Sequence, residues 1–364
     1  MKLTFPHMGN VYISIKALLD TLGVDYYIPP SGNRDTMQRG IENAPEFMCL
    51  PFKKVLGDFI DGLEHGADTI LFGESCGQCR MNYYGDLQQE ILRDMGYKFN
   101  YIHLNLSSLT YSEIMTKLNP LFEGKNKAFV LSAVTDAVRT IFEADGLYRK
   151  SRAVRCRESK KGTVDRIMLQ FEENARKAHG FREIHAAIRS TGKSLGKTLI
   201  NKTLDPVKIG LVGEIFMLSD MFSNLDIEKK LGDMGAFVEN TMSVSEWMRK
   251  HFIGAMLPLK PVDKAVAAAQ NYMHTNDIGG HGIYTIGNAE LMSKSGYDGI
   301  IQIYPFTCMP EIIAQSALGE VSSKNGIPIM TLILDEMTSE TGYITRLEAF
   351  VDMLQMKKDK NAAS

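Results

Sequence analysis

Residues 68–102 read "DTILFGESCGQCRMNYYGDLQQEILRDMGYKFNYI". A short apolar strand is expected at 68–72, a helix at 82–95 and a second strand at 98–102. The order strand, helix, strand is typical of a parallel sheet with helices packed on its faces. This stretch therefore predicts an α/β fold.

The alternation of strands and helices continues along the chain on both sides of a polar central segment. Apolar strand candidates occur at 2–5, 25–28, 207–212, 236–239, 298–303 and 327–333. The middle is helical in pattern and has no strand candidate. We predict an N-terminal α/β domain over residues 1–140, a helical connector over 141–205 and a C-terminal α/β domain over 206–364.

Composition narrows the class of protein. The chain has 364 residues, a net charge of −2 and 23% charged residues, which argues against a general nucleic-acid-binding surface. No apolar run approaches the roughly 20 residues that cross a bilayer. The start "MKLTFPHMGN" lacks the apolar core of a signal peptide. We expect a cytoplasmic protein without a membrane partner, in which the five cysteines are reduced.

Four cysteines follow strands or precede helices. Cys76 and Cys79 come after the strand 68–72, Cys308 comes after 298–303, and Cys49 lies on a loop that leads into a helix. In open parallel sheets, ligands bind beyond the carboxyl ends of the strands. We therefore expect a cleft between the two α/β halves to bring the four cysteines together.

The C-x-x-C spacing of Cys76 and Cys79 suits a redox dithiol, a zinc site or an iron–sulfur site. A dithiol gives no role to Cys49 or Cys308, and zinc sites usually use two close pairs. These arguments favour a cluster over zinc and leave zinc open. Cys156 lies in the basic stretch 148–162, and we expect it to be a free thiol on a solvated segment.

Polar residues at the same rim are candidates for acid–base chemistry or for helix capping. Arg80, next to Cys79, is placed either to stabilise a reduced cluster or to pair with a carboxylate. His281 lies in the glycine-rich stretch "GGHGIY", where backbone can approach a ligand closely. The candidate catalytic residues are Glu74, Glu214, His281, Glu311 and Glu336.

One segment resembles a phosphate loop and fails the comparison. In "GKSLGKT" (192–198) only three residues separate Gly192 from Gly196, where the motif requires four, and the segment follows a helical pattern instead of a strand. The sequence offers no other nucleotide-binding loop.

Seven fragments together resemble the 2-hydroxyacyl-CoA dehydratase-related iron–sulfur proteins, in particular their acyl-CoA dehydratase activase-related branch, also described as CoA protein activases. The resemblance spans nearly the whole chain. The fragments are "KLTFPHMGN" (2–10), "MCLPFKKVLGDFIDGLEHGAD" (48–68), "CGQCRMNYYGDLQQEILRDMGY" (76–97), "VGEIF" (212–216), "GGHGIYTIGNAELM" (279–292), "PFTCMPEIIAQ" (305–315) and "LDEMTSETGYITRLEAFVDML" (334–354).

The resemblance implies two Rossmann-like domains with a [4Fe–4S] cluster in the cleft between them. Matched by position, the ligands would be Cys49, Cys79 and Cys308, with Cys76 either a fourth ligand or a neighbour. Four thiolates would favour simple electron transfer, whereas three would leave one iron open to a substrate oxygen or a small ligand.

The resemblance also implies partners and a reaction class. Electrons would come from a separate ATP-hydrolysing iron–sulfur activator protein, and the chain would form a homodimer or pair with a related subunit. The first functional hypothesis is a redox protein that drives a reduction or a radical-type dehydration, as a 2-hydroxyacyl-CoA dehydratase-like lyase or an ATP-dependent reductase component. The alternative is a non-catalytic electron carrier or cluster scaffold for a partner enzyme.

Overall fold

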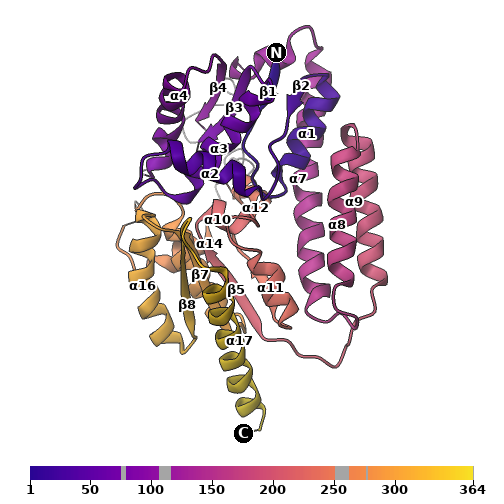
Figure 1. Cartoon of the computed structure of the whole chain (residues 1–364). Coiled ribbons are helices and arrows are strands. Elements are labelled where there is room, and N and C mark those ends of the chain that lie inside the picture. Colours follow the sequence, from indigo (N-terminus) through magenta and orange to yellow (C-terminus); the bar gives the residue numbers. More distant parts are fainter. Residues whose placement is uncertain (75–78, 106–115, 251–261, 276–277, 364) are drawn as a thin grey trace.

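The computed structural model describes residues 1–74, 79–105, 116–250, 262–275 and 278–363. It has an α/β fold with two four-stranded sheets, and every strand pairing in both sheets is parallel. Figure 1 shows the sheet of the N-terminal half above that of the C-terminal half, with three long helices along one side. The α/β class and the parallel sheets expected from the sequence are confirmed.

Both sheets have the same strand order. The first is β2-β1-β3-β4 and the second is β6-β5-β7-β8, so in each the order reverses between the first and the third strand of the half. That reversal is the point at which doubly wound sheets bind ligands. The strands are β1 (Lys2–Thr4), β2 (Asp25–Tyr27), β3 (Thr69–Glu74), β4 (Asn100–Asn105), β5 (Lys208–Gly213), β6 (Phe237–Asn240), β7 (Gly299–Pro305) and β8 (Ile329–Leu334).

The helices of the N-terminal half begin and end at local signals. Gly23 ends the first of them in the left-handed conformation, at φ 65°, which glycine adopts without steric cost. The helical segments are α1 (Val11–Leu22), α2 (Arg34–Asn43), α3 (Leu50–Glu64), the 3₁₀ helix η1 (Arg80–Tyr83), α4 (Tyr84–Asp94) and α6 (Asn119–Phe122).

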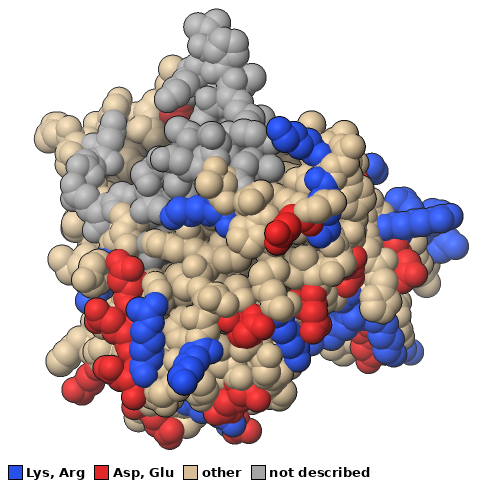
Figure 2. All heavy atoms as spheres, turned by 90° about the horizontal axis from the view of Figure 1, so that it is seen from above, with Lys and Arg blue, Asp and Glu red and all other residues tan. Residues whose placement is uncertain are grey.

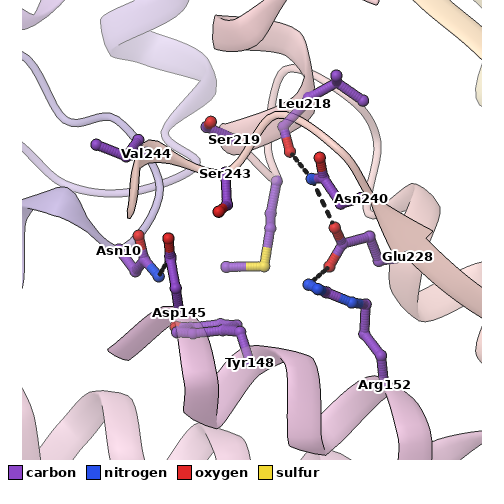
Figure 3. Close-up of a pocket in the computed structure, with 11 residues that line it drawn as sticks. Asn10, Asp145, Tyr148, Arg152, Leu218, Ser219, Glu228, Asn240, Ser243 and Val244 are labelled. Carbon is purple, nitrogen blue, oxygen red and sulfur yellow. Dashed lines mark hydrogen bonds and ion pairs between the residues drawn. The ribbon is translucent and has the colours of Figure 1, made fainter. Parts of the chain in front are cut away.

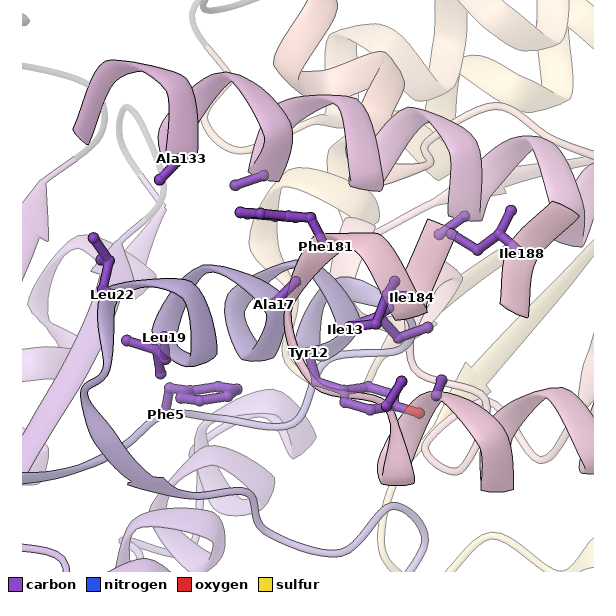
Figure 4. Close-up of a cluster of buried hydrophobic side chains, with 14 of the residues drawn as sticks. Phe5, Tyr12, Ile13, Ala17, Leu19, Leu22, Ala133, Phe181, Ile184 and Ile188 are labelled. Atoms are coloured by element: carbon purple, nitrogen blue, oxygen red, sulfur yellow. The ribbon is translucent and has the colours of Figure 1, made fainter. Parts of the chain in front are cut away.

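Three helices form the layer along one side: α7 (Lys127–Arg155), α8 (Thr163–Lys177) and α9 (Gly180–Lys197). Helices α7 and α9 pack against α1, and α8 packs against α9; Figure 4 shows Ile13 and Ala17 of α1 beside Phe181 and Ile184 of α9. This helical layer begins at Lys127, earlier than residue 141, because α7 is one continuous helix of 29 residues. The division into domains stays a prediction.

The second sheet is buried between two helix layers. Ile301 and Ile303 of β7 join the core formed with α11 and α17, whereas Ile300 joins the core formed with α15 and α16. Successive strand residues point to opposite faces, so a strand covered on both sides is apolar on both. The helices of this half are α10 (Ile215–Ser219), α11 (Ile227–Asp233), α12 (Val244–Met248), α14 (Lys264–Ala269), α15 (Gly282–Ser293), α16 (Met309–Asn325) and α17 (Glu340–Ala363).

Helices α2 and α3 approach each other closely, because glycines stand at their crossing. A Cβ at Gly40 would lie 1.8 Å from the Lys53 carbonyl oxygen, and one at Gly57 would lie 2.1 Å from the Thr36 carbonyl oxygen. Neither distance is sterically possible. The position of α3, which begins directly after Cys49, therefore depends on both glycines.

The surface shows no strong preference for one sign of charge on the face seen in Figure 2. Lys and Arg are interspersed with Asp and Glu among the described atoms of that face. None of the helices in the described ranges is long and apolar enough to cross a membrane.

Candidate functional site

Three of the cysteines line one cavity of about 270 Å³ between the two halves. Cys49 and Cys79 come from the N-terminal half, and Cys308 comes from the C-terminal half. The cavity also contains the side chains that follow the inner strands of the second sheet: Glu214 after β5 and Cys308 after β7. These two strands are neighbours at the point where the strand order reverses, so the cavity lies where the topology favours a ligand.

Each of these cysteines occupies the residue immediately before a helix. Cys49 precedes α3, Cys79 precedes η1 and Cys308 precedes α16, and all three have extended backbone conformations. The unpaired N–H groups and the dipole at a helix start favour negative charge nearby. The local structure thus directs three thiols and three helix starts at one cavity.

Burial works against ionisation of the thiols. Cys49 and Cys308 are each 9% exposed. Loss of hydration raises the pKa of Cys49 to about 11, and it raises the pKa of Cys79 and that of Cys308 as well. The carboxyl groups of Glu311 and Glu214 add to the rise of the Cys308 pKa. A cation that binds here must therefore displace protons from the thiols, which makes its binding pH-dependent.

Tyr84 is a site residue that sequence analysis missed. Its hydroxyl lies 2.7 Å from the Cys49 sulfur, and its ring meets that of Phe52 edge to face at 4.9 Å. Burial raises the pKa of Tyr84, so the phenol keeps its proton and can donate it to a thiolate. The only sequence signal was the pair of tyrosines that follows Cys79, and a pair of this kind is more often core packing.

Arg80 joins the two halves at the rim of the cavity. Its guanidinium donates to the carbonyl oxygen of Thr307 at 2.9 Å and to the Thr307 hydroxyl at 3.0 Å. Thr307 has a φ of 69°, a conformation that a β-branched residue rarely adopts. The strained turn between β7 and α16 is thus held by Arg80 and places Cys308 next in the chain. In these contacts Arg80 pairs with a carbonyl and a hydroxyl, not with the carboxylate that the sequence suggested as one option.

Glu214 caps a helix and also lines the cavity. Its carboxylate accepts hydrogen bonds from the backbone N–H groups of Phe216 at 3.0 Å and Met217 at 2.9 Å. Burial nevertheless raises its pKa to about 6. Glu214 is thus both a helix cap and a residue of the cavity wall.

Glu311 lies behind the cavity wall, in the first turn of α16. It is 1% exposed and accepts hydrogen bonds at 3.0 Å from the Thr285 hydroxyl and the Gln302 amide. Burial raises its pKa to about 7. Glu311 acts on Cys308 and Cys79 through its charge and does not line the described part of the cavity.

The other candidates lie elsewhere or outside the description. Glu336 forms an ion pair with the buried Lys53 of α3, which ties the two halves together. His281 is buried directly before α15, outside the described lining of the cavity. Glu74 is the last residue of β3; its side chain and Cys76 lie outside the described part of the chain.

Cys156 differs in part from the expectation of a free thiol on a solvated segment. Its thiol is free, as expected, but the residue is 2% exposed and stands directly after α7, so the segment is not solvated at this position. Two basic side chains of the same stretch pair with acidic groups, Arg152 with Glu228 of α11 and Arg155 with Asp165 of α8.

No group of three or more His, Cys, Asp and Glu side chains within the described ranges could hold a metal ion. A scan against protein-family models and a search of curated proteins found no match for the chain.

Proposed function

We propose that this chain is an iron–sulfur redox protein, related to the 2-hydroxyacyl-CoA dehydratases, with a [4Fe–4S] cluster bound by Cys49, Cys79 and Cys308. A separate ATP-hydrolysing activator supplies it with low-potential electrons for a reduction or a radical-type dehydration. The observation that carries the proposal is the convergence of these cysteines, 30 and 229 residues apart in sequence (79 − 49 and 308 − 79), on one cavity between two parallel sheets.

The donor atoms fit an iron–sulfur cluster in kind. Thiolates are the usual ligands of such clusters, and each thiolate binds a different iron atom. The ligands of a cluster therefore stand farther apart than those of a single ion, so the three cysteines need not be close enough to bind one metal ion together. The cavity of about 270 Å³ is slightly smaller than the roughly 300–1,000 Å³ found for small-molecule sites.

When bound, the cluster would supply one-electron transfer at low potential. The residues of the chain hold and shield it. The Tyr84 hydroxyl, 2.7 Å from the Cys49 sulfur, would donate a hydrogen bond to that sulfur once it is a thiolate, and Arg80 places a positive charge at the rim next to Cys79. Glu214, with a pKa of about 6, is a carboxyl group in the cavity wall that can take up or release a proton near neutral pH.

An exposed apolar rim supports docking of the activator at this cavity. Phe47, Phe306 and Met309 are 72%, 56% and 59% exposed. The Arg80 guanidinium at the rim donates to the carbonyl oxygens of Phe47 and Thr307, and Phe306 directly precedes Thr307. Met309 lines the cavity itself. Electron transfer requires the two clusters to be close, and apolar side chains around the cavity are suited to a protein contact.

The test is anaerobic reconstitution with ferrous iron and sulfide, followed by iron analysis and absorption spectroscopy. Cys49→Ala, Cys79→Ala and Cys308→Ala should each lose stable cluster binding, because each removes a thiolate that no other described residue of the cavity replaces. Cys156→Ala is the matched control and should bind iron like the wild type. Retention of the full cluster by all three variants would sink the proposal.

Cys76 decides whether one iron is open. A Cys76→Ser protein with an unchanged electron paramagnetic resonance signal would indicate ligation by three cysteines. A changed signal or lost iron would make Cys76 the fourth ligand.

A further inference from the structure

Exposed lysines gather at one end of the helical layer, where α7 and α9 finish and α8 begins. The loop 156–162 and the segment 198–204 lie at this end, and in Figure 1 the chain that joins α9 to β5 runs below the lower ends of the three helices. We call this part of the surface the basic end. Its exposed lysines are Lys150, Lys160, Lys161, Lys193, Lys197 and Lys202.

These lysines carry charge that the chain does not neutralise. Farther into the structure, Arg152 of α7 pairs with Glu228, as Figure 3 shows. Within the described part of the chain, none of the six lysines forms such an ion pair with a carboxylate. Glu158, the one acidic residue of the two segments, is buried and accepts hydrogen bonds from backbone N–H groups at the start of α8. Asp205, the next acidic residue along the chain, pairs with Lys358.

The helix dipoles explain only part of this charge. Lys193 and Lys197 lie near the end of α9, where the dipole favours a positive charge. Lys160 and Lys161 stand directly before α8, at the end of the dipole that disfavours a positive charge. Because this pair opposes the dipole, an anion outside the chain would stabilise it.

Exposed apolar side chains lie among the lysines. Leu199, Ile200 and Leu204 are 80%, 38% and 47% exposed. The segment that carries them is fixed to the loop before α8, since the carbonyl oxygen of Leu199 accepts a hydrogen bond from the Ser159 N–H at 2.9 Å. A partner that covers these side chains therefore has little backbone to order.

The composition of the basic end favours a lipid surface over a protein. Lysine is depleted at protein–protein interfaces, where arginine and aromatic side chains are enriched. The lysine ammonium is a hydrated point charge that suits the spread negative charge of lipid headgroups, and leucine and isoleucine suit the boundary of the acyl chains. The expectation of no membrane partner rested on the lack of a spanning segment and of a signal peptide, and binding at the surface requires neither.

We propose that the basic end binds the surface of a membrane that contains anionic lipids. The lysines contact the headgroups, and Leu199 enters the boundary of the acyl chains. The basic end shares no residue with the described lining of the cysteine cavity, so this proposal and its test do not depend on iron.

The test is co-sedimentation of the full chain with lipid vesicles. Vesicles made of equal parts of phosphatidylcholine and phosphatidylglycerol should bind the chain, and vesicles of phosphatidylcholine alone should bind it at least about tenfold more weakly. Sodium chloride should release the chain from the anionic vesicles, because it screens the attraction.

A double variant tests the charge. Lys160→Gln with Lys161→Gln should weaken binding to the anionic vesicles about tenfold or more, because each lysine near such a surface contributes roughly fivefold. The matched control is Lys125→Gln with Lys127→Gln, at the start of α7 and therefore at the other end of this helix of 29 residues. The control should bind like the wild type.

A single variant tests the apolar contact. Leu199→Ala should weaken binding about fivefold or more, because it removes methylene and methyl groups that enter the lipid. Leu131→Ala, which changes a leucine that is 57% exposed near the start of α7, should have no effect.

Four results would overturn the proposal: anionic vesicles that bind no better than neutral ones, binding that sodium chloride does not weaken, lysine or leucine variants that bind like the wild type, or controls that lose as much as their counterparts. Binding of soluble polyglutamate without binding of vesicles would assign the basic end to an acidic protein instead.

Discussion

The chemistry of the cysteine cavity depends on single residues placed at the starts of helices. Cys49, Cys79 and Cys308 each precede a helix, yet burial keeps their thiols protonated at neutral pH. The helix starts favour negative charge on the sulfur atoms. This effect operates only when a bound cation displaces the protons of the thiols. Tyr84 adds a neutral donor that can stabilise the Cys49 thiolate without adding charge.

Tyr84→Phe tests that donor. The variant keeps the ring packing on Phe52 and removes the hydroxyl, so the cluster should still assemble. Hydrogen bonds to cluster sulfur raise the reduction potential. A charge-assisted hydrogen bond of about 1.5 kcal/mol corresponds to a lowering on the order of 60 mV in a one-electron titration. Tyr83→Phe, at an exposed position, is the control; equal potentials in Tyr84→Phe and wild type would contradict this role.

His7, just beyond β1, makes stability depend on pH. The residue is 3% exposed, and burial, with the nearby charges of Lys54 and Arg176, lowers its pKa to about 3. Below pH 6.5 the unfolded chain binds a proton at this imidazole and the folded chain does not, so stability falls as the pH drops from 6.5 toward 3.

Denaturant unfolding at pH 7.5 and pH 5 measures this effect. Between the two values the wild type should lose about 2 kcal/mol more unfolding free energy than His7→Gln does. Asp58, whose pKa burial raises to about 6, titrates in the opposite direction but is present in both proteins and cancels in the comparison. Equal losses in the two proteins would show that His7 does not titrate as described.

At the scale of elements, the crossing of α2 and α3 sets the position of Cys49. Gly57→Ala would place a Cβ 2.1 Å from the Thr36 carbonyl oxygen, so the two helices must move apart. Overpacking of this kind costs roughly 1–3 kcal/mol, and iron retention should fall as α3 shifts. The free energy of unfolding and the iron content of the reconstituted protein measure the two effects.

Gly319→Ala is the matched control in the middle of α16, where a Cβ would meet no atom within 4 Å. It should stabilise the protein by about 0.5–1 kcal/mol, the usual gain for alanine over glycine in a helix. If both variants behaved alike, close packing would not be the reason for glycine at position 57.

Element types were easier to predict from the sequence than the contacts between elements. Strands such as "VKIGLV" and "DGIIQI" carry apolar residues at successive positions, which indicates a strand buried on both faces. Cys79, Glu214 and Cys308, which the sequence places after strands, line the cavity. The ion pair of Lys53 with Glu336, the burial of Cys156 and the contact of Tyr84 with Cys49 arise from tertiary packing, which no local pattern encodes.

At the scale of the whole molecule, two sheets of identical strand order face one cavity, and the two halves are joined by Arg80 and by the Lys53–Glu336 ion pair. Such an arrangement can hold a redox group between two halves, but the sequence contains no phosphate loop to couple ATP hydrolysis to electron transfer. Under the proposed function, the energy for a low-potential electron would come from a separate activator protein.

A mixing experiment checks this dependence. Reconstituted protein, reductant and ATP should give no cluster reduction beyond that of an ATP-free sample until a cognate iron–sulfur activator is added. Phe306→Asp, which puts a charge on the apolar rim, should lower ATP-dependent reduction about tenfold or more without changing iron content. ATP hydrolysis by this chain alone would refute the need for an activator.

The most direct measurement of the central claim is the metal and sulfide content of the protein purified without oxygen. We predict about four iron atoms and about four acid-labile sulfides per chain, with little zinc. We also predict that Cys308→Ala loses both iron and sulfide, while Cys156→Ala keeps them. Zinc in place of iron, with no acid-labile sulfide, would contradict the assignment of the cysteine cavity to an iron–sulfur cluster.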